Sequence, residues 1–261
     1  MENVPFNDWI TCRAPQPDAA VRLFCFPYAG GGASVYRDWP RLLADNVEVC
    51  AIQLPGRENR LKEPLIRQLP ALIEKLVVEI RPFLTRPFAF FGHSMGALLN
   101  YELTHALMAA GAPGPAHLFL SAYRAPHLPP QRQPIHRLPD KQFIAELRHL
   151  NGTPTEVLAN QELLALVLPI VRNDFAMLET FIPQTHEVLE TPISAFAGLK
   201  DPDISQADVQ AWQQHTTAEF KLRMLPGDHF YLHTYQTLLC RAVERDLLNI
   251  MAQPRQTQPH D

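Results

Sequence analysis

The stretch FAFFGHSMGALLNYEL, residues 88–103, constrains the fold of this chain more than any other. An apolar run of strand length leads into Gly92, and a helix-like apolar pattern starts directly after Ser94. Because glycine has no Cβ, Gly92 and Gly96 allow the strand and the helix to meet at a very sharp turn. Such a turn holds the residue between them in a strained backbone, with its side chain clear of the sheet. We therefore predict a strand–turn–helix unit that presents Ser94 as a nucleophile.

The rest of the chain alternates short apolar runs with helical patterns, which is typical of a mostly parallel sheet covered by helices. Several runs are apolar on both faces, as expected for strands that lie between two layers of helices. The predicted fold class is therefore α/β. The predicted strands are 21–27, 47–53, 88–91, 117–121, 193–197 and 220–225, and the predicted helices are 35–45, 66–81, 95–110, 206–217 and 233–251.

One long segment breaks this alternation. Residues 125–139 are rich in proline, and residues 140–181 have a helical pattern with no good strand among them. A connection of about seventy residues is far longer than usual between a strand and its successor. We interpret residues 124–190 as a helical lid insertion within a single domain that spans 1–261. The alternative is a structural elaboration without a gating role.

Within this lid insertion, an apolar stripe at helical spacing extends from Leu163 to Leu178. Such a stripe packs against other residues in most proteins, and we expect part of it to line a binding chamber. Pro169 lies in the stripe and lacks a backbone N–H, so it is expected to kink or end the helix there.

Composition excludes several classes of function. The net charge is −4 and no long basic run is present, which disfavours a nucleic-acid binder. No targeting segment is evident, and no stretch approaches the ~18 apolar residues of a membrane helix. The four cysteines are scattered without metal-ligand spacing, so we expect reduced thiols in a cytoplasmic protein, with no metal and no cofactor.

A serine hydroxyl becomes a good nucleophile only when a base removes its proton. When a serine stands on such a strand-to-helix turn of a parallel sheet, the nucleophile is followed along the chain by an acid and then a histidine, at the ends of later strands. His229, in LPGDHFYLH, follows the last predicted strand and is the favoured base, with His233 as the alternative. Asp201, in GLKDPDIS, is the favoured acid. Asp203 is the alternative acid, and it could instead cap the helix near 206.

The tetrahedral intermediate of acyl transfer also needs hydrogen-bond donors for its oxyanion. One predicted donor is the backbone N–H of Met95, the residue after the nucleophile. The other should come from the early loop FPYAGGGASVY, and we assign it to Ala29, with Gly30 as the alternative. The glycines of this loop do not form a phosphate-binding motif, because neither GxGxxG nor GxxxxGK[ST] is present.

Six motifs occur here in the order seen in one known family: LFCFPYAGGGASVYRDWP, VEVCAIQLPGRENRLKEP, FFGHSMGALLNYEL, LFLSAYRAPHLP, GLKDP and GDHFYL. In these motifs the chain resembles the type II thioesterases, the stand-alone editing hydrolases of nonribosomal peptide and polyketide synthesis. The resemblance extends from about residue 20 to 250, and QLPGRE is far more specific than GxSxG.

This resemblance implies an α/β-hydrolase that releases stalled or wrong acyl groups from the phosphopantetheine arm of carrier proteins. It supports Ser94, Asp201 and His229 as a catalytic triad, and Ala29 with Met95 as the oxyanion hole. Tyr28 stands where many relatives have histidine, which leaves the role of its side chain open.

The predicted function is therefore that of a serine thioesterase, acting as a monomer on an acylated carrier protein. A carboxylesterase or lipase with the same triad is the first alternative, and a non-catalytic binding protein on a hydrolase scaffold is the second. Carrier proteins are usually acidic, and a basic stretch in the lid insertion could help to dock one. It contains Arg124, Arg132, Arg137, Lys141 and Arg148 against Asp140 and Glu146. An ordinary solvated face is the alternative interpretation of this stretch.

Overall fold

The computed structural model describes residues 6–150, 152 and 155–252. Its strands form one sheet in the order β1-β3-β2-β4-β5-β6-β7. The short strand β1 pairs with β3 in antiparallel fashion, and the remaining neighbours in the sheet pair in parallel. The strands are β1 (Ile10–Thr11), β2 (Val21–Phe26), β3 (Val47–Ile52), β4 (Phe88–His93), β5 (His117–Ser121), β6 (Ile193–Gly198) and β7 (Phe220–Leu225).

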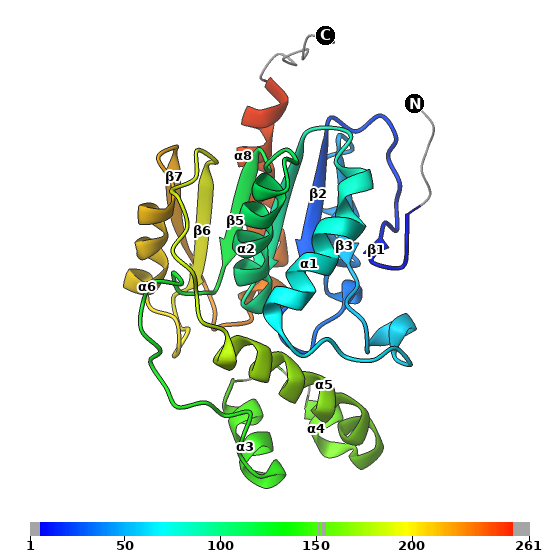
Figure 1. The fold of residues 1–261 in the computed structure, drawn as a ribbon, viewed down its shortest axis with the longest axis vertical. Coiled ribbons are helices and arrows are strands. Elements are labelled where there is room, and N and C mark those ends of the chain that lie inside the picture. Colours follow the sequence, from blue (N-terminus) through cyan, green and yellow to red (C-terminus); the bar gives the residue numbers. More distant parts are fainter. Residues whose placement is uncertain (1–5, 151, 153–154, 253–261) are drawn as a thin grey trace.

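Helices cover both faces of this sheet (Figure 1). The α-helices are α1 (Leu69–Ile80), α2 (Met95–Ala109), α3 (Asp140–Leu150), α4 (Thr155–Ala159), α5 (Gln161–Thr180), α6 (Gln206–Gln210), α7 (Tyr231–Thr234) and α8 (Gln236–Ala252). Helices α1 and α2 lie on the near face in Figure 1, and α8 lies behind the sheet. This arrangement confirms the predicted α/β class.

The central strand β4 shows how the two faces share the core. Its successive side chains point to opposite faces, because strand side chains alternate. Phe90 packs in the apolar cluster that includes Leu72 of α1 and Leu98 of α2. Phe91 packs in the cluster that includes Trp39 and Val243 of α8. Buried on both faces, β4 is a rigid support for the residue that follows it.

The predicted strands and helices were largely confirmed, with two errors. All six predicted strands form within two residues of their expected ends, but β1 was missed. The predicted helix 35–45 is wrong, because that region contains two short 3₁₀ turns, Ala33–Tyr36 and Trp39–Arg41. The predicted helix 206–217 is α6 followed by the 3₁₀ turn Ala211–His215, and the last predicted helix is α7 followed by α8.

The lid insertion contains α3, α4 and α5, which lie across the carboxyl ends of the strands (Figure 1). Pro169 lies inside α5, and the helix continues to Thr180, so the proline does not end it. Ile170, Val171 and Met177 are buried on the far side of the proline, and their packing maintains the helix there. Across the described part of the chain, none of the helices has the length and apolar character needed to cross a membrane.

Candidate active site

Ser94 stands at the junction of β4 and α2, in the sharp turn that the sequence predicts. Its φ of 52° and ψ of −117° lie in a region that residues other than glycine rarely adopt. A Cβ on Gly92 would collide with the backbone of Gly96, and a Cβ on Gly96 would collide with the carbonyl of Phe26. The Ser94 N–H donates to the Ser121 carbonyl over 2.8 Å, which ties the turn to β5. The two glycines therefore permit the turn because their neighbours leave no room for a side chain.

His229 and Asp201 come together from the loops after β7 and β6. His229 Nδ1 lies 2.7 Å from Asp201 Oδ2, and the Asp201 side chain is fully buried. The other carboxylate oxygen, Oδ1, accepts from the backbone N–H groups of Asp203 (2.9 Å) and Ile204 (3.1 Å). Since an ionised carboxylate can only accept, the ring carries a proton on Nδ1, and Nε2 is left as the acceptor.

The two residues that competed with this pair in the sequence analysis have other partners. His233 Nε2 lies 3.0 Å from the Tyr28 hydroxyl, and burial lowers the pKa of His233. Asp203 forms an ion pair with Arg132 at 3.4 Å. Asp203 does not cap α6, because Ser205 is the N-cap residue and forms a capping box with Asp208.

Tyr28 forms part of the wall beside the serine. Its ring packs edge-on against His93, Phe230 and His233. Burial raises the pKa of the Tyr28 hydroxyl to about 12, so it stays protonated at neutral pH and can donate to His233. The Tyr28 hydroxyl thus holds the His233 ring in place.

The sequence analysis gave no role to His93, which precedes the nucleophile. It is completely buried, and its Nδ1 lies 2.9 Å from Ser121 Oγ. Burial, reinforced by the nearby His229, lowers the pKa of His93 well below its ordinary value. His93 is therefore neutral under ordinary conditions, and its ring, 5.3 Å from that of His229, supports the histidine without adding charge.

The glycine-rich loop after β2, residues 28–32, is held by side chains of the QLPGRE segment, residues 53–58. Arg57 Nη1 donates to the Gly31 carbonyl over 3.1 Å, and Gln53 Oε1 accepts over 2.7 Å from the N–H of Ala33, which directly follows the loop. The Gly30 N–H donates over 2.8 Å to Oδ2 of Asp174, a residue of α5. Sequence reasoning missed Asp174, although a lone acid inside an apolar stripe was a usable signal.

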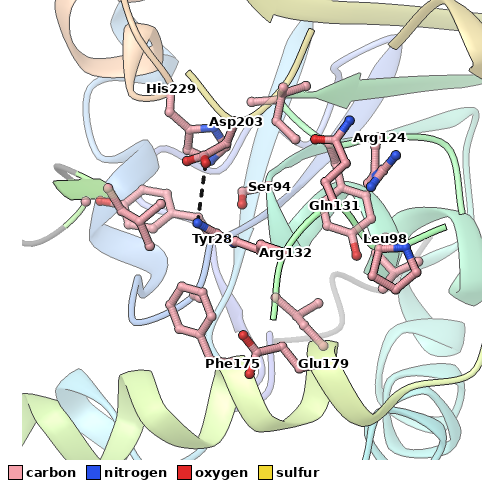
Figure 2. A pocket seen from close by; sticks show the side chains of 18 of the residues that line it. Tyr28, Ser94, Leu98, Arg124, Gln131, Arg132, Phe175, Glu179, Asp203 and His229 are labelled. Carbon is pink, nitrogen blue, oxygen red and sulfur yellow. Dashed lines mark hydrogen bonds and ion pairs between the residues drawn. The ribbon is translucent and has the colours of Figure 1, made fainter. Parts of the chain in front are cut away.

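A cavity of about 920 Å³ opens above the serine. Ser94, Ala29 and His229 line it, and Figure 2 shows the Ser94 hydroxyl between His229 and the α5 side chains Phe175 and Glu179. The lid insertion supplies most of the remaining wall: Val171, Phe175 and Leu178 come from the apolar stripe, as predicted, whereas Leu163 is 43% exposed on the surface.

Charged groups at the cavity are paired within the chain. The dashed line in Figure 2 joins Arg132 to Asp203 across the cavity. Arg124 pairs with Asp208 at 3.1 Å. No group of three or more histidine, cysteine or acidic residues is placed to hold a metal ion within the described ranges.

A mostly parallel seven-stranded sheet, with a serine on a strained strand-to-helix turn and an Asp–His pair beyond later strands, defines an α/β-hydrolase. Comparison with known proteins specifies which kind. The family described as thioesterase domain matches residues 21–247, and the chain belongs to this family.

Three relatives show the extent of the similarity. The gramicidin S biosynthesis protein GrsT of Aneurinibacillus migulanus is 44% identical over 227 residues, which cover 87% of this chain and 89% of that protein. Thioesterase PikA5 of Streptomyces venezuelae is 38% identical, over 98% of this chain and 92% of its own. The structure of the type II thioesterase BorB, from the borrelidin biosynthetic cluster, superposes with a TM-score of 0.85 at 34% identity, covering 94% of this chain and all of BorB. The chain is thus a thioester hydrolase of the type II thioesterase kind.

Proposed function

We propose that this enzyme edits nonribosomal peptide or polyketide synthesis by hydrolysing aberrant or stalled acyl groups from the phosphopantetheine arm of carrier proteins. One observation carries the proposal: Ser94 and His229 line the same large cavity, and His229 is hydrogen-bonded to the buried Asp201. The relatives support the choice of pathway, since GrsT is named for gramicidin S biosynthesis and BorB belongs to the borrelidin cluster.

In the proposed reaction Ser94 Oγ attacks the thioester carbonyl while His229 Nε2 takes the hydroxyl proton. The tetrahedral intermediate collapses, the C–S bond breaks, and His229 returns the proton to the departing phosphopantetheine sulfur. His229 then removes a proton from a water molecule that attacks the acyl-serine ester. The carboxylic acid leaves and Ser94 regains its proton. Asp201 holds the His229 ring in the tautomer that these steps need, and it stabilises the imidazolium.

The proposed oxyanion donors are the backbone N–H groups of Ala29 and Met95. Met95 is the first residue of α2, so its N–H has no partner within that helix. The alternative donor, Gly30, already gives its N–H to Asp174, which favours Ala29. Loss of one such donor costs about 10²–10³ in kcat in comparable sites.

An acidic carrier protein is the proposed partner, and the lid insertion offers three exposed basic residues for docking: Arg137, Lys141 and Arg148. The other two basic residues of the stretch, Arg124 and Arg132, are paired with Asp208 and Asp203. We therefore expect charge reversal at the three exposed positions to raise KM for an acylated carrier protein. The same change should leave turnover of a small thioester unaltered. An unchanged KM for the carrier would contradict this docking surface.

A turnover screen tests the proposed function. One carrier protein is loaded with acetyl, medium-chain, aryl and aminoacyl groups, and hydrolysis is compared with that of simple oxyesters of matched chain length. We expect faster release from the carrier, abolished in Ser94→Ala, and covalent labelling of Ser94 by a fluorophosphonate. Preference for the oxyesters would instead identify a carboxylesterase, and failure to label the intact protein would identify a non-catalytic scaffold.

A further inference from the structure

A buried ion pair joins the lid insertion to the body of the enzyme. Arg57 and Asp174 meet in a bidentate contact, with Nη1 2.7 Å from Oδ2 and Nη2 2.9 Å from Oδ1. Asp174 lies on α5, and Arg57 belongs to the QLPGRE segment after β3. Their side chains are 0% and 5% exposed, which makes this a fully desolvated pair.

Both partners also contact the glycine-rich loop, residues 28–32. Asp174 accepts from the Gly30 N–H, and Arg57 donates to the Gly31 carbonyl, so two successive residues of the loop are fixed. Helix α5 packs directly on the same place, since a Cβ on Gly30 would lie 2.6 Å from Val171 Cγ2. The Ala29 N–H shares its peptide group with the Tyr28 carbonyl, which accepts from the Gly31 N–H over 2.9 Å. The direction of the Ala29 N–H is therefore tied to the position of Gly31.

Stability alone does not account for such a pair. Removing two charges from water costs several kcal/mol per ion, and well-packed apolar residues often serve stability as well or better. What an apolar pair cannot supply is a set of directed hydrogen bonds to Gly30 and Gly31, in a loop whose three consecutive glycines restrict the backbone little.

We propose that Asp174 and Arg57 are positioning residues, which aim the Ala29 N–H at the oxyanion only when α5 is seated on the loop. This inference rests on the proposed function, because it takes Ala29 as an oxyanion donor. It makes the lid insertion part of the chemistry. Lifting α5 would separate Asp174 from Gly30 and loosen the oxyanion hole, so the intermediate is stabilised only under a closed lid.

The test uses Asp174→Asn, which removes the charge opposite Arg57. In either orientation the amide NH₂ faces a donor, Arg57 Nη2 on one side or the Gly30 N–H and Arg57 Nη1 on the other, so the contacts to the loop are disturbed. We expect kcat on an acyl thioester to fall by about 10–100-fold, with KM within about twofold, because a displaced donor costs somewhat less than a lost one. Affinity for a trifluoromethyl ketone analogue, which forms an oxyanion on Ser94, should fall in parallel. Affinity for an unreactive thioether analogue should not change.

A matched control separates positioning from stability. Glu48→Gln breaks another buried arginine–carboxylate pair, Arg22–Glu48 at 2.6 Å, which lies near the amino ends of β2 and β3, away from the serine. It should lower the urea midpoint comparably and leave kcat unchanged. In the double variant Arg57→Met/Asp174→Leu, the urea midpoint should recover and kcat should stay low.

Two results would overturn the proposal. One is a kcat of Asp174→Asn within threefold of the wild type, and the other is a kcat of the double variant that recovers together with its stability. Either result would leave the proposed function intact, provided that the wild type turns over the thioester and is labelled at Ser94. A wild type that does neither would instead refute the proposed function.

Discussion

Replacing Asp201 by asparagine should disable the enzyme by changing a tautomer, with the fold intact. The Asp201 carboxylate has two distinct sides in the structure. Oδ2 accepts from His229 Nδ1, and Oδ1 accepts from two backbone N–H groups, those of Asp203 and Ile204. An asparagine amide offers one acceptor and one donor, so it can satisfy only one of these sides.

The magnitude follows from which side the amide satisfies. Turning its NH₂ toward the two backbone N–H groups would leave both donors unpaired in a buried site, at about 1–3 kcal/mol each. The amide therefore keeps its oxygen there and presents NH₂ to His229 Nδ1. The ring proton must then move to Nε2, and His229 can no longer take the proton of Ser94. We expect kcat to fall by about 10⁴, as when the orienting acid of such a triad is made neutral.

The assay is the turnover of an acyl-N-acetylcysteamine thioester at pH 7, with urea unfolding to verify the fold. Asp203→Asn is the matched control, because Asp203 is two residues away and its side chain pairs with Arg132 rather than with His229. We expect less than about tenfold loss for this control. The reasoning is refuted if the two variants lose activity equally, or if Asp201→Asn loses less than about tenfold.

Three further predictions follow from contacts around the site and in the core. Gly30→Ala should lower the free energy of unfolding by about 1–3 kcal/mol, because the new methyl group clashes with Val171. In a Val171→Ala background, urea unfolding should show that most of this loss is recovered, except for the strain of a φ near +80°. If the losses of the two single variants simply add in the double variant, the contact is contradicted. Burial lowers the pKa of His117 to about 4. As the pH decreases below about 6.5, this histidine is therefore protonated in the unfolded chain but not in the folded one, and the free energy of unfolding decreases. Thermal melts of His117→Gln should show a loss of stability between pH 7 and 4 that is smaller than in the wild type by up to about 3 kcal/mol. The same pH dependence in variant and wild type would show that His117 does not contribute. Tyr28→Phe removes the bond to His233 and should lower the free energy of unfolding by about 1 kcal/mol, with kcat within threefold; a large kcat loss would give the hydroxyl a role in the reaction.

Much of the fold could be predicted because the signals were local. The glycines around Ser94 could be interpreted without a structure, since a sharp turn between strand and helix leaves few alternatives. Strands buried on both faces, such as β4, are continuous apolar runs and are recognised as such. The choices of Asp201 and His229 came from the order of strands, and the structure brings their side chains into contact.

The failures occurred where packing overrides local preference. Tyr36 and Trp39 are three residues apart and both buried, which suits an α-helix and a pair of 3₁₀ turns equally well. Strand β1 has only two residues, too few for any periodicity. Pro169 does not end α5, because contacts made by Ile170 and the residues after it outweigh the loss of one hydrogen bond.

The sequence could single out Asp174 as a lone acid in an apolar stripe, but it could not predict its partners, because they are remote. Gly30 and Arg57 lie 144 and 117 residues away along the chain, and nothing in the local pattern of α5 links it to them. The specificity of QLPGRE as a motif was visible, but not its physical basis. In the structure, Arg57 of this segment contacts the glycine-rich loop at Gly31, and Gln53 contacts Ala33 directly after it.

The placement of the lid insertion has a consequence for how such enzymes diversify. Ser94, Asp201 and His229 follow β4, β6 and β7, and none of them lies within residues 124–190. A chimera could therefore exchange this whole segment for that of a relative, altering which acyl groups fit while the proposed proton chemistry of the triad is inherited unchanged. If Asp174 acts as we propose, one residue limits that freedom: the incoming helix must bring a carboxylate to Arg57, or the graft would bind its substrates and turn them over slowly.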